Sequence, residues 1–171
     1  MTEEQFWEIV ESTKAAAGSS FDGHFKKLVA RLTTLEPEEI AAFDRNFDIL
    51  SIRAYSWDLW GAAYVIHGGC SDDSFTDFRS WLISMGRNVY ERALADPESL
   101  ADIELGPDGE EDVFFEVFGY VAATAYRAKM GKEMSLVVTP YPSDPSGEPF
   151  EEDSDDLARR YPRLFARYGN E

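Results

Sequence analysis

The sequence has few of the residues on which disulfides, zinc sites and secretion depend. Among 171 residues there are one cysteine and two histidines. A single cysteine cannot form an internal disulfide, and this set of side chains is too small for an ordinary structural zinc site. The opening MTEEQFWEIV carries acids in place of the basic and then apolar regions of a secretory signal. We therefore predict a cytoplasmic protein with no cofactor and no metal.

Positive charge is also scarce. Lysine and arginine number 16 against 33 aspartates and glutamates, which gives a formal net charge of −17. Nucleic-acid affinity normally comes from lysine and arginine that neutralise phosphates. The densest basic cluster follows a run of acids that offsets it, and consists of Arg159, Arg160, Arg163 and Arg167. We expect no nucleic-acid partner; an acidic tail that mimics a nucleic acid remains an alternative that rests on charge alone.

Long apolar runs are missing. The longest apolar stretch runs from Leu59 to Ile66, well short of the roughly 18 residues that suggest a membrane-spanning helix. We therefore expect no membrane association.

Motifs of the common enzyme classes are missing too. The sequence holds no glycine-rich phosphate loop, no HExxH helix and no GxSxG elbow. The acidic run from Glu148 to Asp156 lacks the glycine and the glutamate that a calcium loop places at its sixth and twelfth positions. We interpret this run as a solvated linker.

Aromatic residues, in contrast, are abundant. The chain has 12 Phe, 8 Tyr and 4 Trp, and its length suits one domain that buries its own core without disulfides or metal. We predict a single domain over residues 1–171, with a core at about 3–140.

The spacing of apolar residues at three and four positions predicts helices through most of the chain. Thr2 with Gln5 suggests a capping box, and Gly68-Gly69 followed by Ser71 marks the clearest helix boundary. The predicted helices cover residues 3–17, 21–32, 37–67 with a bend at 48–51, 72–95 and 113–130, and a short turn covers 97–100.

The last part of the chain predicts an extended segment and a final helix. Residues 136–139 have strand character, but Pro140 and Pro142 demote them to an edge strand or a strap. An acidic linker at about 143–154 leads to a docking helix at about 155–168, which Pro162 bends or delays. The predicted fold is an all-α domain of about six to eight helices, with an acidic, proline-containing strap before a short C-terminal helix.

One long string is distinctive. Residues 57–87 read WDLWGAAYVIHGGCSDDSFTDFRSWLISMGR, and the chain opens with FWEIV and closes with YPRLFARYG. From Phe6 to Gly169 the sequence resembles the bacterial family called domain of unknown function 4240. The resemblance implies a mostly helical bacterial domain and carries no activity or catalytic residue.

Cys70 and His67 form the first candidate for chemistry. Cys70 directly precedes the predicted start of a helix, where the helix dipole favours a thiolate, and His67 is a conceivable base. The alternative is a buried, inert cysteine, because Asp72 and Asp73 raise a nearby thiol's pKa.

Asp72, Asp73 and Asp77 form the second candidate. Asp73 and Asp77 share a helix face at a spacing of four. Such a pair can bind a divalent cation or divide acid and base roles. The alternative is a set of acids that favour a helix N-terminus, with one of them paired to Arg79.

Trp57, Asp58 and Trp60 form the third candidate. An acid between two large aromatic side chains suggests a pocket if its pKa is perturbed. Paired with Arg53 or Arg79, Asp58 would instead tie two helices together.

Two functions follow from these patterns. We favour a non-catalytic domain that binds a protein partner, or a second copy of itself, near the junction at residues 57–79, because aromatic and arginine side chains dominate interface energetics. The alternative is a small-ligand or metal-binding enzyme that uses Asp58, Asp72, Asp73 and Asp77 with Arg79 or Arg87. The candidate binding residues are Trp57, Asp58, Trp60, His67, Asp72, Asp73, Asp77, Arg79 and Arg87.

Overall fold

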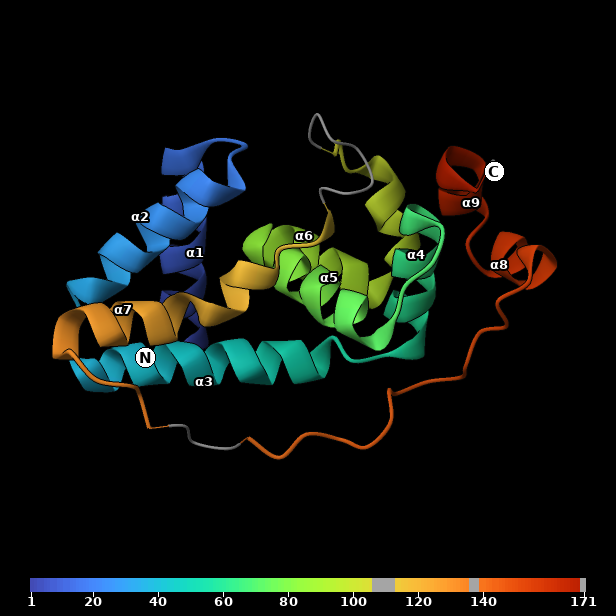
Figure 1. Ribbon diagram of the computed structural model, residues 1–171. Coiled ribbons are helices and arrows are strands. Elements are labelled where there is room, and N and C mark those ends of the chain that lie inside the picture. Colours follow the sequence, from blue (N-terminus) through green and yellow to red (C-terminus); the bar gives the residue numbers. More distant parts are fainter. Residues whose placement is uncertain (106–112, 136–138, 170–171) are drawn as a thin grey trace.

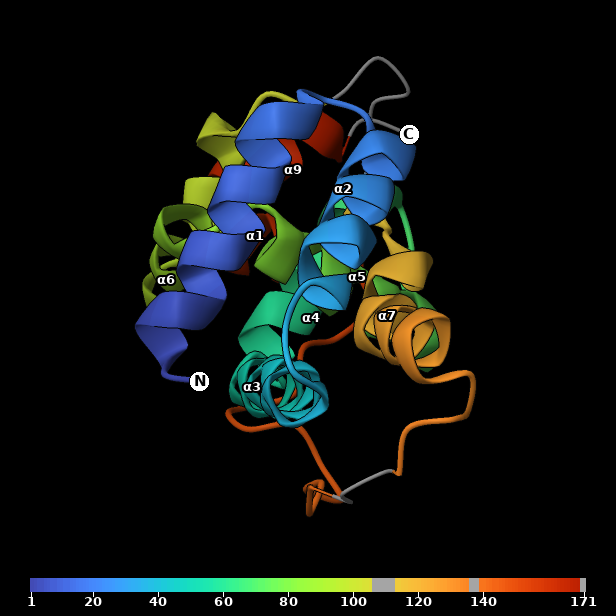
Figure 2. The same ribbon diagram turned by 90° about the vertical axis from the view of Figure 1, so that its left-hand side faces the viewer.

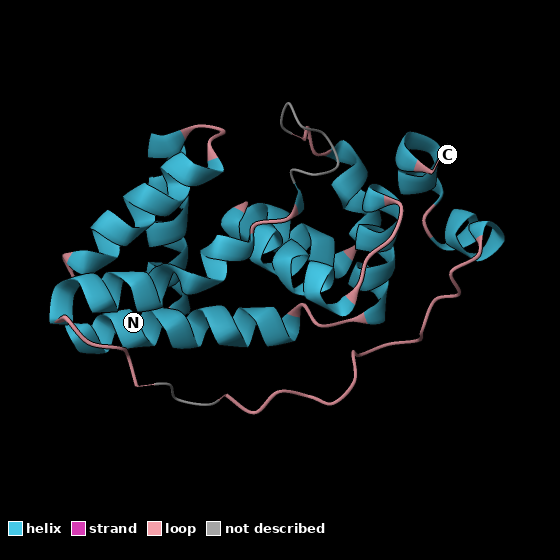
Figure 3. Ribbon diagram, viewed as in Figure 1, coloured by secondary structure: helices cyan, strands magenta, loops and turns pink. Residues whose placement is uncertain are grey.

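The computed structural model describes residues 1–105, 113–135 and 139–169, and in these ranges the chain forms helices and loops (Figure 3). This confirms the predicted all-α class. The helices are α1 (Glu3–Ala17), α2 (Phe21–Thr33), α3 (Pro37–Arg53), α4 (Trp57–His67), α5 (Asp72–Ser84), α6 (Arg87–Ala95), the 3-10 helices η1 (Pro97–Asp102) and η3 (Glu116–Tyr120), α7 (Val121–Met130), α8 (Ser154–Arg160) and α9 (Pro162–Tyr168). No helix in the described ranges is both long and apolar enough to cross a membrane.

The first helices begin at the residues that the sequence marks as caps. The Thr2 side chain accepts a hydrogen bond from the N–H of Gln5, and the Gln5 side chain accepts one from the N–H of Thr2. The Ser20 side chain caps α2 by accepting a single hydrogen bond from the N–H of Gly23 at 3.0 Å. The two helices pack against each other, and α7 packs against α2 and lies alongside α3 (Figure 2). Their shared core includes Phe6 and Phe43, with ring centroids 4.5 Å apart.

The predicted bend at 48–51 is wrong, because α3 runs without a break to Arg53. The chain turns at Ala54 to Ser56, and Ser56 caps α4 by accepting a hydrogen bond from the N–H of Leu59 at 3.3 Å. A serine side chain that satisfies an N–H at the start of a helix sets the boundary there.

The helix predicted over 72–95 is two helices, α5 and α6. Gly86 separates them with φ of 99°, which L side chains rarely adopt. Glu11 of α1 stabilises this break, since its Oε1 accepts a hydrogen bond from the N–H of Arg87 at 2.9 Å. Glu11 is remote in sequence from Gly86, so its contact could not be predicted. The regular spacing of apolar residues over 72–95, taken alone, predicted a continuous helix.

The helix predicted from residue 113 begins later than expected. Residues 116–120 form η3, and the α-helix α7 starts only at Val121. Phe115 and Phe118 face the core beside His24, with ring centroids 6.2 Å and 5.6 Å from its ring. Three-residue spacing of buried side chains suits a 3-10 helix, in which positions i and i+3 align.

The C-terminal helix is divided at Tyr161. Its backbone lies at φ −126° and ψ 57°, outside the helical region, because the following Pro162 disfavours α geometry. Glu98 of η1 then holds the start of α9, since its carboxylate accepts hydrogen bonds from the N–H groups of Arg163 and Leu164 at 2.7 Å and 3.1 Å. Residues 136–138 of the predicted strand lie outside the described residues.

A long extended segment joins the two ends of the molecule. We call residues 139–153 the strap. In Figure 1 it passes below α3 toward α4, and α8 and α9 follow beside α4. The strap therefore brings a late part of the sequence against the junction of α3, α4 and α5.

Candidate functional site

A row of stacked aromatic rings lies at this junction. The rings of Trp57 and Trp60 are 5.2 Å apart and nearly parallel, and Trp60 stacks on Phe75 at 4.9 Å. Tyr55 extends the row, 6.1 Å from Phe75. Trp57 and Trp60 are partly exposed, and the Nε1–H of Trp60 donates to the carbonyl of Cys70 at 2.8 Å. We call Tyr55, Trp57, Trp60 and Phe75 the aromatic row.

Arg79 lies at one end of the aromatic row and is only 3% exposed. Its guanidinium carbon is 4.8 Å from the Tyr55 ring centroid and 5.0 Å from that of Phe75. Its N–H groups donate to the Phe75 and Ser51 carbonyls and to the Thr76 hydroxyl, at 3.3 Å, 3.0 Å and 3.0 Å. Burial lowers the pKa of Arg79. In the described ranges no carboxylate forms an ion pair with it, so its charge is held by dipoles and aromatic faces.

The strap pairs with the backbone beside this row. The N–H of Trp57 donates to the carbonyl of Ser146 at 2.9 Å, and the N–H of Ser146 donates to the carbonyl of Tyr55 at 3.0 Å. Together they form a parallel bridge between Ser56 and Ser146. The turn between α3 and α4 therefore acts as a short edge on which an extended chain can bind.

Two aromatic side chains of the strap pack on the same surface. Tyr141 lies 5.1 Å from the Tyr55 ring, and its hydroxyl accepts a hydrogen bond from Arg79. The ring centroid of Phe150 lies 6.1 Å from that of Trp57, in a T-shaped arrangement, and 5.5 Å from that of Tyr64. Tyr141 remains 50% exposed, so the strap lies over the aromatic row without burying itself deeply.

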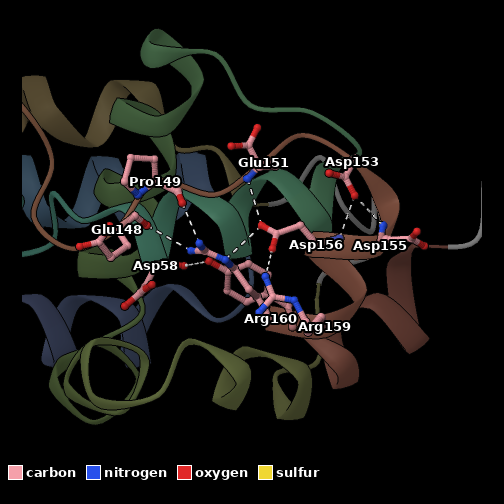
Figure 4. A network of polar contacts seen from close by, with 10 residues as sticks. Asp58, Glu148, Pro149, Glu151, Asp153, Asp155, Asp156, Arg159 and Arg160 are labelled. Carbon is pink, nitrogen blue, oxygen red and sulfur yellow. Dashed lines mark hydrogen bonds and ion pairs between the residues drawn. The ribbon is translucent and has the colours of Figure 1, made fainter.

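A polar network fixes the far end of the strap (Figure 4). The guanidinium of Arg160 donates to the carbonyls of Glu148 and Pro149 at 3.1 Å and 2.7 Å. Asp156 accepts a hydrogen bond from the N–H of Glu151 at 3.0 Å and forms an ion pair with Arg160 at 3.1 Å. The hydrogen bond from the Glu151 N–H is the largest of the effects that lower the pKa of Asp156 below its usual value.

The sequence analysis did not assign Arg160 or Asp156 to the site. Their spacing of four residues is the signal that could have identified an ion pair on one helix. The contacts of Arg160 with strap carbonyls could not be predicted, since they depend on how the strap folds back.

A cavity of about 240 Å³ opens beside Arg79. It is lined by Arg79, Tyr141 and three acids, Asp48, Asp77 and Glu116. Burial, with Glu116 and Asp73 nearby, raises the pKa of Asp77. Of the four carboxylates in the enzyme hypothesis, only Asp77 lines this cavity.

The other two acids of the predicted α5 cluster, Asp72 and Asp73, do not line the cavity beside Arg79 with Asp77. Asp72 and Asp73 are exposed in the first turn of α5, which Ser71 caps through the N–H of Ser74. Within the residues that the structure describes, no group of three or more histidine, cysteine or carboxylate side chains is placed to hold a metal ion.

Asp58 belongs to a different surface from Arg79. Its side chain is exposed and lines a cavity of about 400 Å³ with Arg159, Arg160 and Tyr161. Its carbonyl accepts a hydrogen bond from the Tyr161 hydroxyl at 2.9 Å. Asp58 therefore contributes its backbone to the docking of α9.

The arginines that the sequence analysis considered are also separated. Arg53 pairs with Glu3 at 3.1 Å, and Arg87 pairs with Glu91 at 2.6 Å. Neither lines the cavity beside Arg79.

Cys70 and His67 do not form a nucleophile and base pair in this structure. Nδ1 of His67 bonds to the Gly69 carbonyl at 3.0 Å, and its ring meets the Phe114 ring edge to face at 4.6 Å. Burial raises the pKa of Cys70 to about 12, and Asp72 adds to this rise while Arg79 opposes it.

Cys70 is accordingly expected to react slowly with a thiol reagent. At pH 8 the native thiol should react at least about tenfold more slowly than the same thiol in urea, because the thiolate is the reacting form. The measurement is the rate of colour release from Ellman's reagent, with unfolded protein as the control. Equal rates in the native and unfolded states would contradict the burial of this thiol.

Comparison with known proteins identifies a family. A family model described as "Protein of unknown function (DUF4240)" matches residues 1–128. No curated protein and no solved structure matches the chain. The match covers the aromatic row and Arg79 but ends before the strap, α8 and α9.

Proposed function

The chain belongs to the DUF4240 family, and from this premise we propose that it is a non-catalytic, cytoplasmic interaction domain that binds an extended segment of a partner protein over the aromatic row and Arg79. The observation that carries the proposal is the strap itself. It occupies this surface through backbone pairing at Ser146 and through Tyr141 and Phe150. A surface that binds one extended segment has the geometry to bind another of similar chemistry.

The chemistry of the strap defines the partner. Its aromatic side chains, Tyr141 and Phe150, are separated by a proline-containing, acidic stretch that stays extended. Tyr141 supplies a ring and a hydroxyl to Arg79, and Phe150 fills the space beside Trp57. We expect a partner segment with a tyrosine and a second aromatic residue at this spacing.

The strap also acts as an internal competitor. A partner segment can bind only in the fraction of molecules whose strap is displaced, so the strap lowers the apparent affinity by that fraction. The strap is held at Tyr141, Ser146 and Phe150 and by the hydrogen bonds from Arg160 to the Glu148 and Pro149 carbonyls. Thr139 and Glu152 add hydrogen bonds with Asp48 and Tyr64. Weakening the contacts of Tyr141 and Phe150 should make it easier for an added segment to displace the strap.

Binding of a labelled peptide tests the proposal. The peptide copies residues 139–152, and the protein is the full chain, either unchanged or with Tyr141→Ala and Phe150→Ala together. The double variant should bind the peptide about tenfold or more tightly than the unchanged chain, as measured by fluorescence anisotropy. Adding Trp57→Ala to the double variant should abolish this gain.

The matched control is the same peptide with alanine at both aromatic positions, which should bind neither protein. Equal binding of both peptides, or a gain that survives Trp57→Ala, would contradict the proposal. The mass of each protein, measured by light scattering, shows whether the partner is a second copy of the chain. Exchange of straps between two copies would give a dimer, and the peptide would dissociate it.

The alternative of a small-ligand enzyme has less support. Among its proposed carboxylates and arginines, Asp77 and Arg79 alone line one cavity, while Asp58 and Arg87 contact other parts of the fold. The hypothesis required at least two of its own acids to meet an arginine in one cavity. The other two acids beside Arg79, Asp48 and Glu116, were not among those it named.

A further inference from the structure

Another concave site lies on the other side of the molecule from the strap. It is a cavity of about 220 Å³ between the α1–α2 turn, the end of α5 and the residues after η1. Figures 1 and 2 place the α1–α2 turn at the top of the molecule and the strap at the bottom. This cavity therefore has no part in the proposed binding of an extended segment.

The walls of the cavity are largely apolar. Phe21, Met85 and Leu105 line it, together with Trp81, which is 2% exposed. His24 also lines the cavity and is 4% exposed, and its Nε2 bonds to the Val10 carbonyl and the Thr13 hydroxyl. Walls of this kind favour a flat or branched apolar group, because burial of apolar surface is the main source of affinity in such sites.

One cation lies among these apolar walls. The ammonium of Lys14 donates to the carbonyl of Met85 at 2.9 Å and to its Sδ at 3.3 Å. Both acceptors are uncharged, although an ammonium has three donors. The nearby acid, Glu11, is engaged by the N–H of Arg87. In the described ranges no carboxylate lies within ion-pair distance of Lys14.

Partial burial of this ammonium is costly. Desolvation is the largest cause that lowers the pKa of Lys14, and Glu11 only partly opposes it. A buried charge is stabilised when an opposite charge and further hydrogen bonds accompany it. An anion that enters the cavity supplies both and uses the third donor of the ammonium.

The geometry points to a binding site for a small monocarboxylate with an apolar body of about one ring. Its carboxylate pairs with Lys14, and its body packs between Phe21, Trp81 and Leu105. The volume of about 220 Å³ limits the ligand to a compact molecule, since sites for larger ligands start at roughly 300 Å³. Glu104 lies at the rim and pairs with Arg167 at 3.7 Å, with its side chain 93% exposed, so its charge is largely screened by solvent.

Titration of the full-length protein with benzoate, followed by amide NMR shifts, tests the site. Benzoate should shift the amides of residues 14, 18–21, 84, 85 and 105 and show contacts between its ring protons and those of Trp81. Benzamide, which keeps the ring without the charge, and acetate, which keeps the charge without the ring, should each bind at least about tenfold more weakly.

Lys14→Met keeps the apolar stem and removes the charge, so it should weaken benzoate binding at least about tenfold. Lys27→Met, at an exposed position of α2, is the matched control and should leave binding unchanged. Equal affinity for benzoate and benzamide, unchanged binding to Lys14→Met, or shifts outside the cavity would overturn the assignment. The contacts with Trp81 test it in the unchanged protein, so a misfolded variant does not remove the test.

Discussion

Replacing Gly61 with alanine is expected to lower the free energy of unfolding by about 2–4 kcal/mol and to loosen α9 from α4. A Cβ at this position would lie 2.7 Å from Cζ of Tyr161 and 2.8 Å from its Cε2. Tyr161 cannot move away cheaply, since it is 3% exposed and its hydroxyl donates to the Asp58 carbonyl at 2.9 Å. The added methyl group therefore either strains the core or displaces the tyrosine.

Urea unfolding of Gly61→Ala and of Gly119→Ala measures this effect. Gly119 is the matched control, because a Cβ there would lie 3.8 Å from the nearest side chains, an ordinary contact. A double-mutant cycle with Tyr161→Leu adds a second check. The cost of Gly61→Ala should shrink when the tyrosine is absent, whereas an equal cost in both backgrounds would show that the clash with Tyr161 is not the cause.

The role of Gly61 shows where sequence reasoning ends. Periodicity and caps predicted α1, α2 and the boundary at Gly68 to Ser71, because those signals lie within one helical turn of the residues they control. Gly61 lies inside a predicted helix, and nothing near it in the sequence explains a glycine there. Its reason is Tyr161, which reaches α4 only after the strap has crossed the molecule.

The errors in the predicted fold have two origins, one distant in sequence and one local. The continuous helix over 72–95 was broken at Gly86 with the help of Glu11, a residue of α1. The bend in α3 was placed too early, because the apolar spacing gave no weight to the cap at Ser56. Local patterns thus located most helices, while a contact between distant segments helped to set the break between α5 and α6.

The candidate site was likewise predictable only where it depends on residues that are close in sequence. The aromatic and arginine side chains of residues 57–79 predicted a binding surface there, and Trp57, Trp60 and Arg79 do lie at one junction. What occupies the junction could not be predicted, since the bridge between Ser56 and Ser146 joins parts of the chain far apart in sequence. The carboxylates Asp72 and Asp73 were assigned by proximity in sequence, and both face solvent.

Acidification is expected to destabilise the protein through His24, by up to about 3 kcal/mol between pH 6.5 and pH 4. Burial is the largest cause that lowers the pKa of His24 to about 4, from an ordinary value of 6.5, and the positive charge of Lys14 acts in the same direction. Between pH 6.5 and 4, His24 therefore binds a proton in the unfolded chain but not in the folded protein. The stability that His24 contributes is complete above pH 6.5 and is lost as the pH falls toward 4.

Asp44 opposes this trend in the same pH range. Burial, together with Asp48, raises its pKa to about 6 from 3.8. The folded protein therefore binds the extra proton, so this group adds stability as the pH falls from 6 to 3.8. A pH profile of the unchanged protein alone mixes the two effects, whereas a comparison of two proteins that both keep Asp44 isolates His24.

The comparison uses His24→Gln. In the unchanged protein Nε2 of His24 lies 3.2 Å from the Val10 carbonyl oxygen, and the side-chain N–H of glutamine can donate a hydrogen bond to that oxygen in its place. At pH 7 this variant should be the less stable protein, because glutamine fills less of the space beside Phe115 and Phe118. As the pH falls to 4, the unchanged protein should lose more stability than the variant, so the two urea midpoints converge or cross. An NMR titration of the His24 ring with a midpoint of about 4 would support the same cause, while parallel stability curves would rule out His24 as the source of the acid sensitivity.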